Sequence, residues 1–184
     1  KLEREIELPT LGTVSELGGE WDGDEAFFGF TSFATPSAIY HVDLMKLPES
    51  SGSRQSSIHS PASPLGKEGD AGVSLWEKVT APIDPDQYAI KQVRCKSKDG
   101  TEVPMFVLHR TGLELEGNRP TVLYGYGGFN VNQSPSFIAS LPMWLEHGGV
   151  FCVATLRGGG EYGESWHQAG MLGNKQNVFD DFIA

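Results

Sequence analysis

VFCVATLRGGG, residues 150–160, opens with seven uncharged residues and closes with three consecutive glycines. An apolar run of this length is typical of a strand that is buried on both faces, as in a parallel sheet covered by helices. The glycines permit backbone conformations that other residues avoid, and they predict a tight loop directly after the strand. We therefore interpret residues 150–156 as a central strand of an α/β domain.

The segments on either side of this strand continue the pattern. Residues 121–124 form a short apolar run that leads into a glycine-rich stretch, YGYGGFN at 124–130. Apolar residues at near 3.6-residue spacing predict a helix over 136–147, although Pro142 inside it implies a break. Residues 177–184 have the pattern of the opening turns of an amphipathic helix.

A hairpin precedes these segments. Residues 88–96 and 103–109 have strand patterns, and the turn between them, at 97–100, contains an Asp-Gly pair. Asp-Gly is among the strongest short-range hairpin signals. The second half of the chain is therefore predicted to run hairpin, strand, helix, buried strand and helix.

The first half is predicted to be all β. Strand-like runs at 26–30, 38–44 and 73–80 are separated by turn signals such as Gly18-Gly19. Short strands at this spacing fit a sandwich, a barrel or a propeller blade. Residues 48–72 are rich in Ser, Pro and Gly, and they predict a flexible insertion.

The change from β to mixed α/β predicts two domains. We expect the boundary near residues 75–85, so that residues 1–75 belong to the first domain and 76–184 to the second.

Composition excludes several function classes. The net charge is −10, which argues against a nucleic-acid binder because such a surface needs clustered Lys and Arg. No apolar run reaches the roughly 18 residues that a membrane-spanning helix requires. Cys95 and Cys152 are far apart and lack metal-ligand spacing, so we expect buried free thiols, which are consistent with a reducing compartment.

A complete active site is not found in the sequence. It contains no G-x-S-x-G nucleophile elbow and no H-E-x-x-H zinc motif. The stretch GYGGFN has the first two glycines of a dinucleotide motif, but Asn130 occupies the third position. The loop at 157–161, RGGGE, lacks the G-K-[ST] end of a phosphate-binding loop. We reject both nucleotide readings.

The glycine-rich stretch after residues 121–124 does suggest a chemistry. In α/β-hydrolases, the loop after the third strand supplies one arm of the oxyanion hole. The glycines around Tyr126 permit a backbone that aims its phenol at a reacting carbonyl. Such a donor contributes roughly 3–4 kcal/mol in comparable sites.

Four segments carry a family resemblance: FFGFTSFATPSAIYHVDL at 27–44, SKDGTEVPMFVLHR at 97–110, LYGYGGFN at 123–130 and LRGGGEYGESWHQAGMLGNKQNVFDDF at 156–182. In content, order and spacing they resemble the prolyl oligopeptidases, a family of serine peptidases. The resemblance implies an α/β fold class, namely the first part of an α/β-hydrolase domain preceded by the last part of a seven-bladed β-propeller.

The resemblance also implies a function. The intact protein would cleave short proline-containing peptides on the carboxyl side of proline, as a cytoplasmic monomer without metal or cofactor and without nucleic-acid or membrane partners. Tyr126 matches the family's oxyanion-hole tyrosine, and Phe129 matches an aromatic residue that lines the substrate pocket. The Ser, Asp and His of the triad would all follow Ala184.

Other polar and aromatic residues receive structural roles at this stage. We expect Arg157, Glu161 and Glu164 to form an ion-pair network that orders the glycine loop. Tyr124 is predicted to lie in the core. His167 is taken as structural, and His109 and His147 as satisfied surface residues. For Asp180 and Asp181 we expect no role beyond a favourable interaction with the helix dipole.

Two alternatives remain open. Residue 184 lies inside a helical pattern without a stop signal, which indicates that the natural chain continues. The chain would then be a truncated piece that is inactive by itself. An esterase or lipase of the same fold is the other alternative, because the residues that would exclude it are not in this sequence.

Overall fold

The computed structural model describes residues 6, 8–47 and 72–184, which form two compact units. One unit comprises residues 1–82 with 135–137, and the other comprises residues 83–134 with 138–184. The division follows Pro82, and strand β4 (Val73–Lys78) pairs with β3 (Ala38–Asp43) and completes the first sheet. The insertion predicted at 48–72 lies outside the described residues, except for Gly72.

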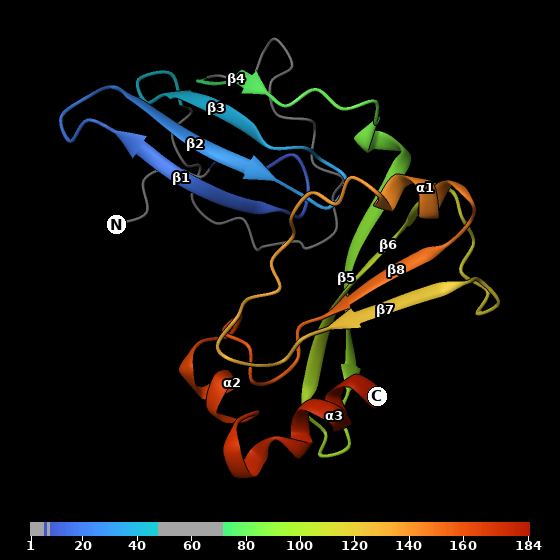
Figure 1. The fold of residues 1–184 in the computed structure, drawn as a ribbon. Helices are drawn as coiled ribbons and strands as arrows, with labels where there is room; N and C mark the ends of the chain where they lie inside the picture. Colours follow the sequence, from blue (N-terminus) through green and yellow to red (C-terminus); the bar gives the residue numbers. More distant parts are fainter. Residues whose placement is uncertain (1–5, 7, 48–71) are drawn as a thin grey trace. The chain divides into compact units, whose positions relative to one another are not determined.

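The first unit is an antiparallel sheet of four strands in the order β1-β2-β3-β4 (Figure 1). Strand β1 is Thr13–Gly19, β2 is Glu25–Thr31 and β3 is Ala38–Asp43. The strands predicted around residues 26–30, 38–44 and 73–80 are confirmed. The prediction of a turn at Gly18-Gly19 is wrong, because both glycines pair with β2. The register of this pairing shifts between Ser15 and Gly18.

One face of this sheet carries the hydrophobic core of the unit. Alternate side chains point to the same face of a strand, so aromatic and β-branched residues two apart gather there. The Phe28 and Tyr40 rings stack with their centroids 5.3 Å apart, and Phe30 meets Tyr40 edge-on. The buried members of this core are Phe28, Phe30, Ala38, Tyr40, Val42, Leu47 and Val73.

The second unit contains a mixed sheet of four strands in the order β5-β6-β8-β7. Strands β5 (Tyr88–Lys96) and β6 (Glu102–Arg110) form the predicted hairpin. Strand β8 (Val150–Ala154) lies antiparallel to β6 and parallel to β7 (Thr121–Gly125). The apolar run at 150–156 is thus a central strand, as predicted.

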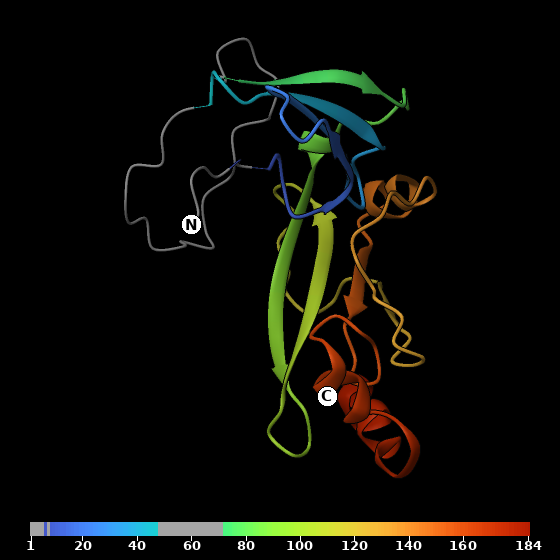
Figure 2. The same cartoon turned by 90° about the vertical axis from the view of Figure 1, so that its left-hand side faces the viewer.

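Three short helices accompany this sheet: α1 (Leu141–Glu146), α2 (Glu164–Gln168) and α3 (Gln176–Ile183). The helix predicted over 136–147 is wrong in its first half. It begins at Leu141 because Pro142 suits the first turn of a helix, where its missing N–H needs no partner. Figure 1 shows α2 and α3 beyond the carboxyl ends of β7 and β8, and Figure 2 shows them beyond that end of β8. Ligands of α/β sheets bind at that end.

Val178 of α3 packs into the core of this unit with Val103, Ala154 and Leu156. Both cysteines are free, as predicted; Cys152 is buried and Cys95 half-buried. Burial raises the pKa of the Cys152 thiol, so it remains protonated at neutral pH. Among the helices of the described residues, none is long and apolar enough to cross a membrane.

Candidate active site

The loop after β7 contains two adjacent buried glycines, Gly127 and Gly128. Gly127 has φ +58°, and a Cβ there would collide with Val178 Cγ1 and lie 2.8 Å from Leu156 Cβ. Any other residue would therefore push the loop away from the core. Gly127 and Gly128 are buried, whereas Tyr126 and Phe129 on either side of them are exposed.

A second glycine loop, residues 157–163 after β8, packs against this one through backbone atoms. A Cβ on Gly158, whose φ is +94°, would lie 2.7 Å from the Gly127 carbonyl oxygen. The Gly158 carbonyl accepts hydrogen bonds from the Asn130 N–H at 3.2 Å and from His167 Nδ1 at 2.8 Å. The two loops thereby fix one another, and His167 is structural, as predicted.

Tyr126 presents a free hydroxyl at this loop. Its side chain is 47% exposed, and its hydroxyl forms no hydrogen bond with any described residue. A phenol that is held on a packed backbone and has no partner is available as a donor to a bound molecule.

Phe129 stands out because of both its exposure and its backbone. The residue is 86% exposed, and it has φ +52° next to Asn130 at φ +57°. Non-glycine residues seldom adopt this left-handed conformation, and residues that do so cluster at functional sites. Packing within the described residues does not account for a large apolar side chain in this position.

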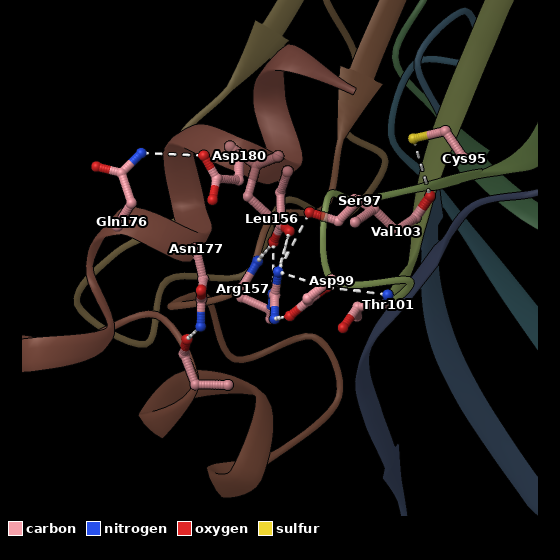
Figure 3. A network of polar contacts seen from close by, with 12 residues as sticks. Cys95, Ser97, Asp99, Thr101, Val103, Leu156, Arg157, Gln176, Asn177 and Asp180 are labelled. Carbon is pink, nitrogen blue, oxygen red and sulfur yellow. Dashed lines mark hydrogen bonds and ion pairs between the residues drawn. The ribbon is translucent and has the colours of Figure 1, made fainter.

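A buried arginine lies beneath the two loops. Arg157 directly follows β8, and its guanidinium contacts carboxylates from two distant parts of the chain. Its Nη2 lies 2.5 Å from Asp181 Oδ1 in α3, and its Nη1 lies 2.5 Å from Asp99 Oδ2 in the β5–β6 turn. Figure 3 shows the guanidinium pointing toward Asp99 and Ser97, whose hydroxyl accepts from Nη2 at 3.2 Å.

These contacts complete the hydrogen bonding of the cluster. The Asp181 carboxylate also accepts from the Arg157 backbone N–H at 3.1 Å, and it is fully buried. The Arg157 guanidinium, together with the Thr101 N–H, lowers the pKa of Asp99 well below its usual value. Asp181 in turn raises the pKa of Arg157, so Arg157 is charged at neutral pH, as is Asp99.

The ion-pair network predicted for Arg157 is wrong in its partners. Glu161 accepts a hydrogen bond from the Gln133 N–H at 2.8 Å, and Glu164 accepts from Gln168 at 2.7 Å. Asp181 was assigned no role beyond the helix dipole, which is also wrong. The sequence held a signal, because Asp181 lies three residues after the buried Val178 on the same face of a helix.

Two further expectations about side chains are wrong. Tyr124 is exposed rather than in the core, because β7 is an outer strand of the described sheet. His109 is buried rather than on the surface, and its Nδ1 lies 2.9 Å from the Arg110 carbonyl oxygen. His147 is exposed, and its Nδ1 lies 2.7 Å from the Met143 carbonyl oxygen.

In residues 6, 8–47 and 72–184, no group of three or more His, Cys, Asp or Glu side chains is arranged to hold a metal ion. The candidate site comprises the hydroxyl of Tyr126, the ring of Phe129 and the two glycine loops.

Comparison with protein families finds two matches. The model of the prolyl oligopeptidase N-terminal β-propeller domain matches residues 1–51. The model of the prolyl oligopeptidase family matches residues 135–184. The two matches fall at opposite ends of the chain, in the order propeller and then hydrolase.

Individual relatives agree with these matches. A prolyl endopeptidase of Elizabethkingia miricola is 38% identical over 185 residues, which is 100% of this chain and 23% of the relative. A prolyl endopeptidase of Dictyostelium discoideum is 34% identical over 186 residues, 100% of this chain and 21% of the relative. The chain thus spans less than a quarter of the length of these proteins.

Solved structures of such enzymes share the fold. One, from a structural and mechanistic analysis of two prolyl endopeptidases, is 48% identical with a TM-score of 0.75, and the match covers 97% of this chain and 23% of that one. Prolyl oligopeptidase B from Galerina marginata, bound to a 25mer macrocyclization substrate, is 30% identical with a TM-score of 0.73 over 95% of this chain and 22% of that one. The chain belongs to the prolyl oligopeptidase family of serine peptidases, and it carries the carboxyl-terminal part of the family's β-propeller followed by the start of its α/β-hydrolase domain.

Proposed function

We propose that the full-length protein that carries this chain is a serine endopeptidase that hydrolyses short peptides on the carboxyl side of proline. Relatives over the whole chain are prolyl endopeptidases, and a related structure holds a peptide substrate. In this proposal Tyr126 and Phe129 belong to the active site. The nucleophile, the general base and the acid that orients it are assigned to no residue of this chain.

The observation that carries the proposal is the Tyr126 hydroxyl. Tyr126 is half-exposed, and its hydroxyl has no hydrogen-bond partner among the described residues. The next two residues of the chain, Gly127 and Gly128, are buried and hold its backbone in place. When a nucleophile attacks a peptide carbonyl, negative charge develops on the carbonyl oxygen. A donor that is already fixed in place stabilises this charge without reorganising at the moment of reaction.

Phe129 supplies the selectivity for proline in this proposal. A proline ring is apolar and has no N–H to satisfy, so an aromatic wall suits it. Phe129 offers an exposed aromatic ring on the same short loop as the Tyr126 hydroxyl, two residues after the buried Gly127. The loop thereby carries one group for the reacting carbonyl and one for the residue before the scissile bond.

The cysteines and the charge of the chain bear on the compartment and the partners of the enzyme. The two free thiols, Cys95 and Cys152, fit the reducing cytoplasm. The acidic composition fits peptides rather than nucleic acid as partners. We propose a cytoplasmic monomer that uses no metal or cofactor and does not bind membranes.

A substrate panel tests the activity. We expect the full-length protein to cleave a chromogenic Gly-Pro amide with a kcat/KM at least about a hundredfold above that for the matching Gly-Ala amide, as expected when an apolar pocket distinguishes the two side chains. Hydrolysis of simple acyl esters without cleavage of either amide would instead favour the esterase of the same fold. Equal cleavage of both amides would remove the proline selectivity from the proposal.

Replacing Phe129 by alanine tests the pocket. We expect KM for the Gly-Pro amide to rise about tenfold with kcat changed little, because a lost apolar contact of about 1–2 kcal/mol weakens ground state and transition state alike. Leu172→Ala is the matched control, since Leu172 is also apolar, 84% exposed and at φ +50°. If both variants raise KM equally, Phe129 has no special place in the pocket.

A further inference from the structure

We infer that Lys175 is a positioning residue that orients the Tyr126 loop through the carbonyl of Gly127. The inference rests on the proposed role of Tyr126 and adds a residue to it. Lys175 is 48 residues further along the chain than Gly127, yet its Nζ donates a hydrogen bond of 2.8 Å to the Gly127 carbonyl oxygen.

The carbonyl of Gly127 depends on this contact. Within the described part of the chain, Lys175 Nζ is the one hydrogen-bond donor to it. Glycine populates many backbone conformations, so the peptide plane between Gly127 and Gly128 needs an external partner to hold it. A charged donor on a carbonyl is stronger than a neutral one.

Lys175 is itself well placed to act as an anchor. It directly precedes α3, and its N–H donates to the Leu172 carbonyl at 3.2 Å while its own carbonyl accepts from the Val178 N–H at 3.2 Å. Its Nζ lies 5.9 Å from the centre of the Phe179 ring. Both the backbone and the side chain of Lys175 are therefore held by neighbouring residues.

The geometry connects Lys175 to Tyr126 through the backbone of the glycine loop. The Gly127 carbonyl that it holds belongs to the residue immediately after Tyr126. The Gly158 backbone also runs close to this carbonyl, since a Cβ on Gly158 would lie 2.7 Å from the Gly127 oxygen. Loss of the lysine bond would leave the Gly127 carbonyl without a hydrogen-bond donor, and the Tyr126 hydroxyl would be aimed less precisely.

A double-mutant cycle in the full-length protein tests the inference, using a Gly-Pro amide as substrate. We expect Lys175→Met to lower kcat by roughly tenfold or more with KM little changed, because misplacing a catalytic group costs up to about a hundredfold. In the Tyr126→Phe background, we expect the same substitution to change kcat by less than about twofold, because the lysine then has no Tyr126 hydroxyl to position and the two effects are not additive. Lys175→Arg, which keeps a charged donor, should restore most of the activity.

A control and a second measurement separate positioning from general loss of stability. Lys91→Met removes an exposed lysine of β5 in the same unit, whose side chain forms no hydrogen bond or ion pair with a described residue, and it should leave kcat unchanged. Hydrogen–deuterium exchange of a peptide covering residues 123–130 should become faster in Lys175→Met but not in Lys91→Met. If Lys175→Met does not fold, Lys175→Gln takes its place in the same comparisons.

The possible results have distinct meanings. If Tyr126→Phe lowers kcat and Lys175→Met does not, the inference about Lys175 is wrong and the proposed function stands. If the two losses multiply in the double variant, Lys175 acts independently of Tyr126, which also overturns it. If Tyr126→Phe has no effect, the oxyanion role fails, and the inference fails with it.

Discussion

Replacing Arg157 by methionine is expected to destabilise the hydrolase part of the protein by about 3–5 kcal/mol, the usual cost of removing one partner from a buried ion pair. The reason is the carboxylate that remains. Asp181 is fully buried, and it accepts three hydrogen bonds from the Arg157 side chain within 3.1 Å. Without the guanidinium its charge has no compensation, and the end of β8 separates from α3.

Local and global measurements check this expectation. Hydrogen–deuterium exchange of a peptide covering residues 176–183 in the full-length protein should report earlier opening of α3, and the urea midpoint should fall. Arg94→Met serves as the control, since Arg94 is an exposed residue of β5 whose side chain forms no hydrogen bond or ion pair with a described residue. An effect no larger than that of the control would show that the cluster contributes nothing to folding.

The two carboxylates of the cluster should differ in their importance. The side chain of Asp99 is 47% exposed, and exposed ion pairs contribute little to stability because water and salt screen them. Asp99→Asn is therefore expected to cost much less than Arg157→Met. Because the folded-state pKa of Asp99 is lowered, its contribution is present above the ordinary carboxyl pKa of about 4 and is lost as the pH falls further.

The elements that the sequence predicted well are those specified by local signals. The hairpin of β5 and β6 follows from two alternating runs around an Asp-Gly turn, and β8 follows from one apolar run. The helix predicted over 136–147 is too long, because apolar spacing alone does not show that Pro142 lies in the first turn of the helix. Local pattern thus predicts where elements lie better than where they begin.

The partners of Arg157 could not be predicted by the same reasoning. Asp99 and Asp181 lie 58 and 24 residues away in sequence, whereas Glu161 and Glu164 were chosen because they are near. Only the fold brings the β5–β6 turn, the end of β8 and α3 to one point. The bond from Lys175 to Gly127 is of the same kind, since nothing in a glycine-rich stretch indicates which distant donor will hold its carbonyls.

Replacing Tyr126 by phenylalanine is expected to lower kcat for a Gly-Pro amide by roughly a hundredfold or more, as with other oxyanion-hole donors, and to leave KM nearly unchanged. Loss confined to kcat is the mark of an interaction made in the transition state. The substitution removes one oxygen atom and keeps the ring, so the packing of the loop on Gly127 and Gly128 should persist. Steady-state kinetics of the full-length protein provide the measurement.

Tyr124→Phe is the matched control for this experiment. Tyr124 is exposed to almost the same extent as Tyr126, its hydroxyl forms no hydrogen bond with the described residues, and it lies two positions earlier in the chain. We expect its removal to leave kcat unchanged, because β7 rather than the glycine loop holds it. If kcat falls equally in both variants, either phenol hydroxyl affects the enzyme through solubility or stability. The Tyr126 hydroxyl would then not be the donor to the oxyanion.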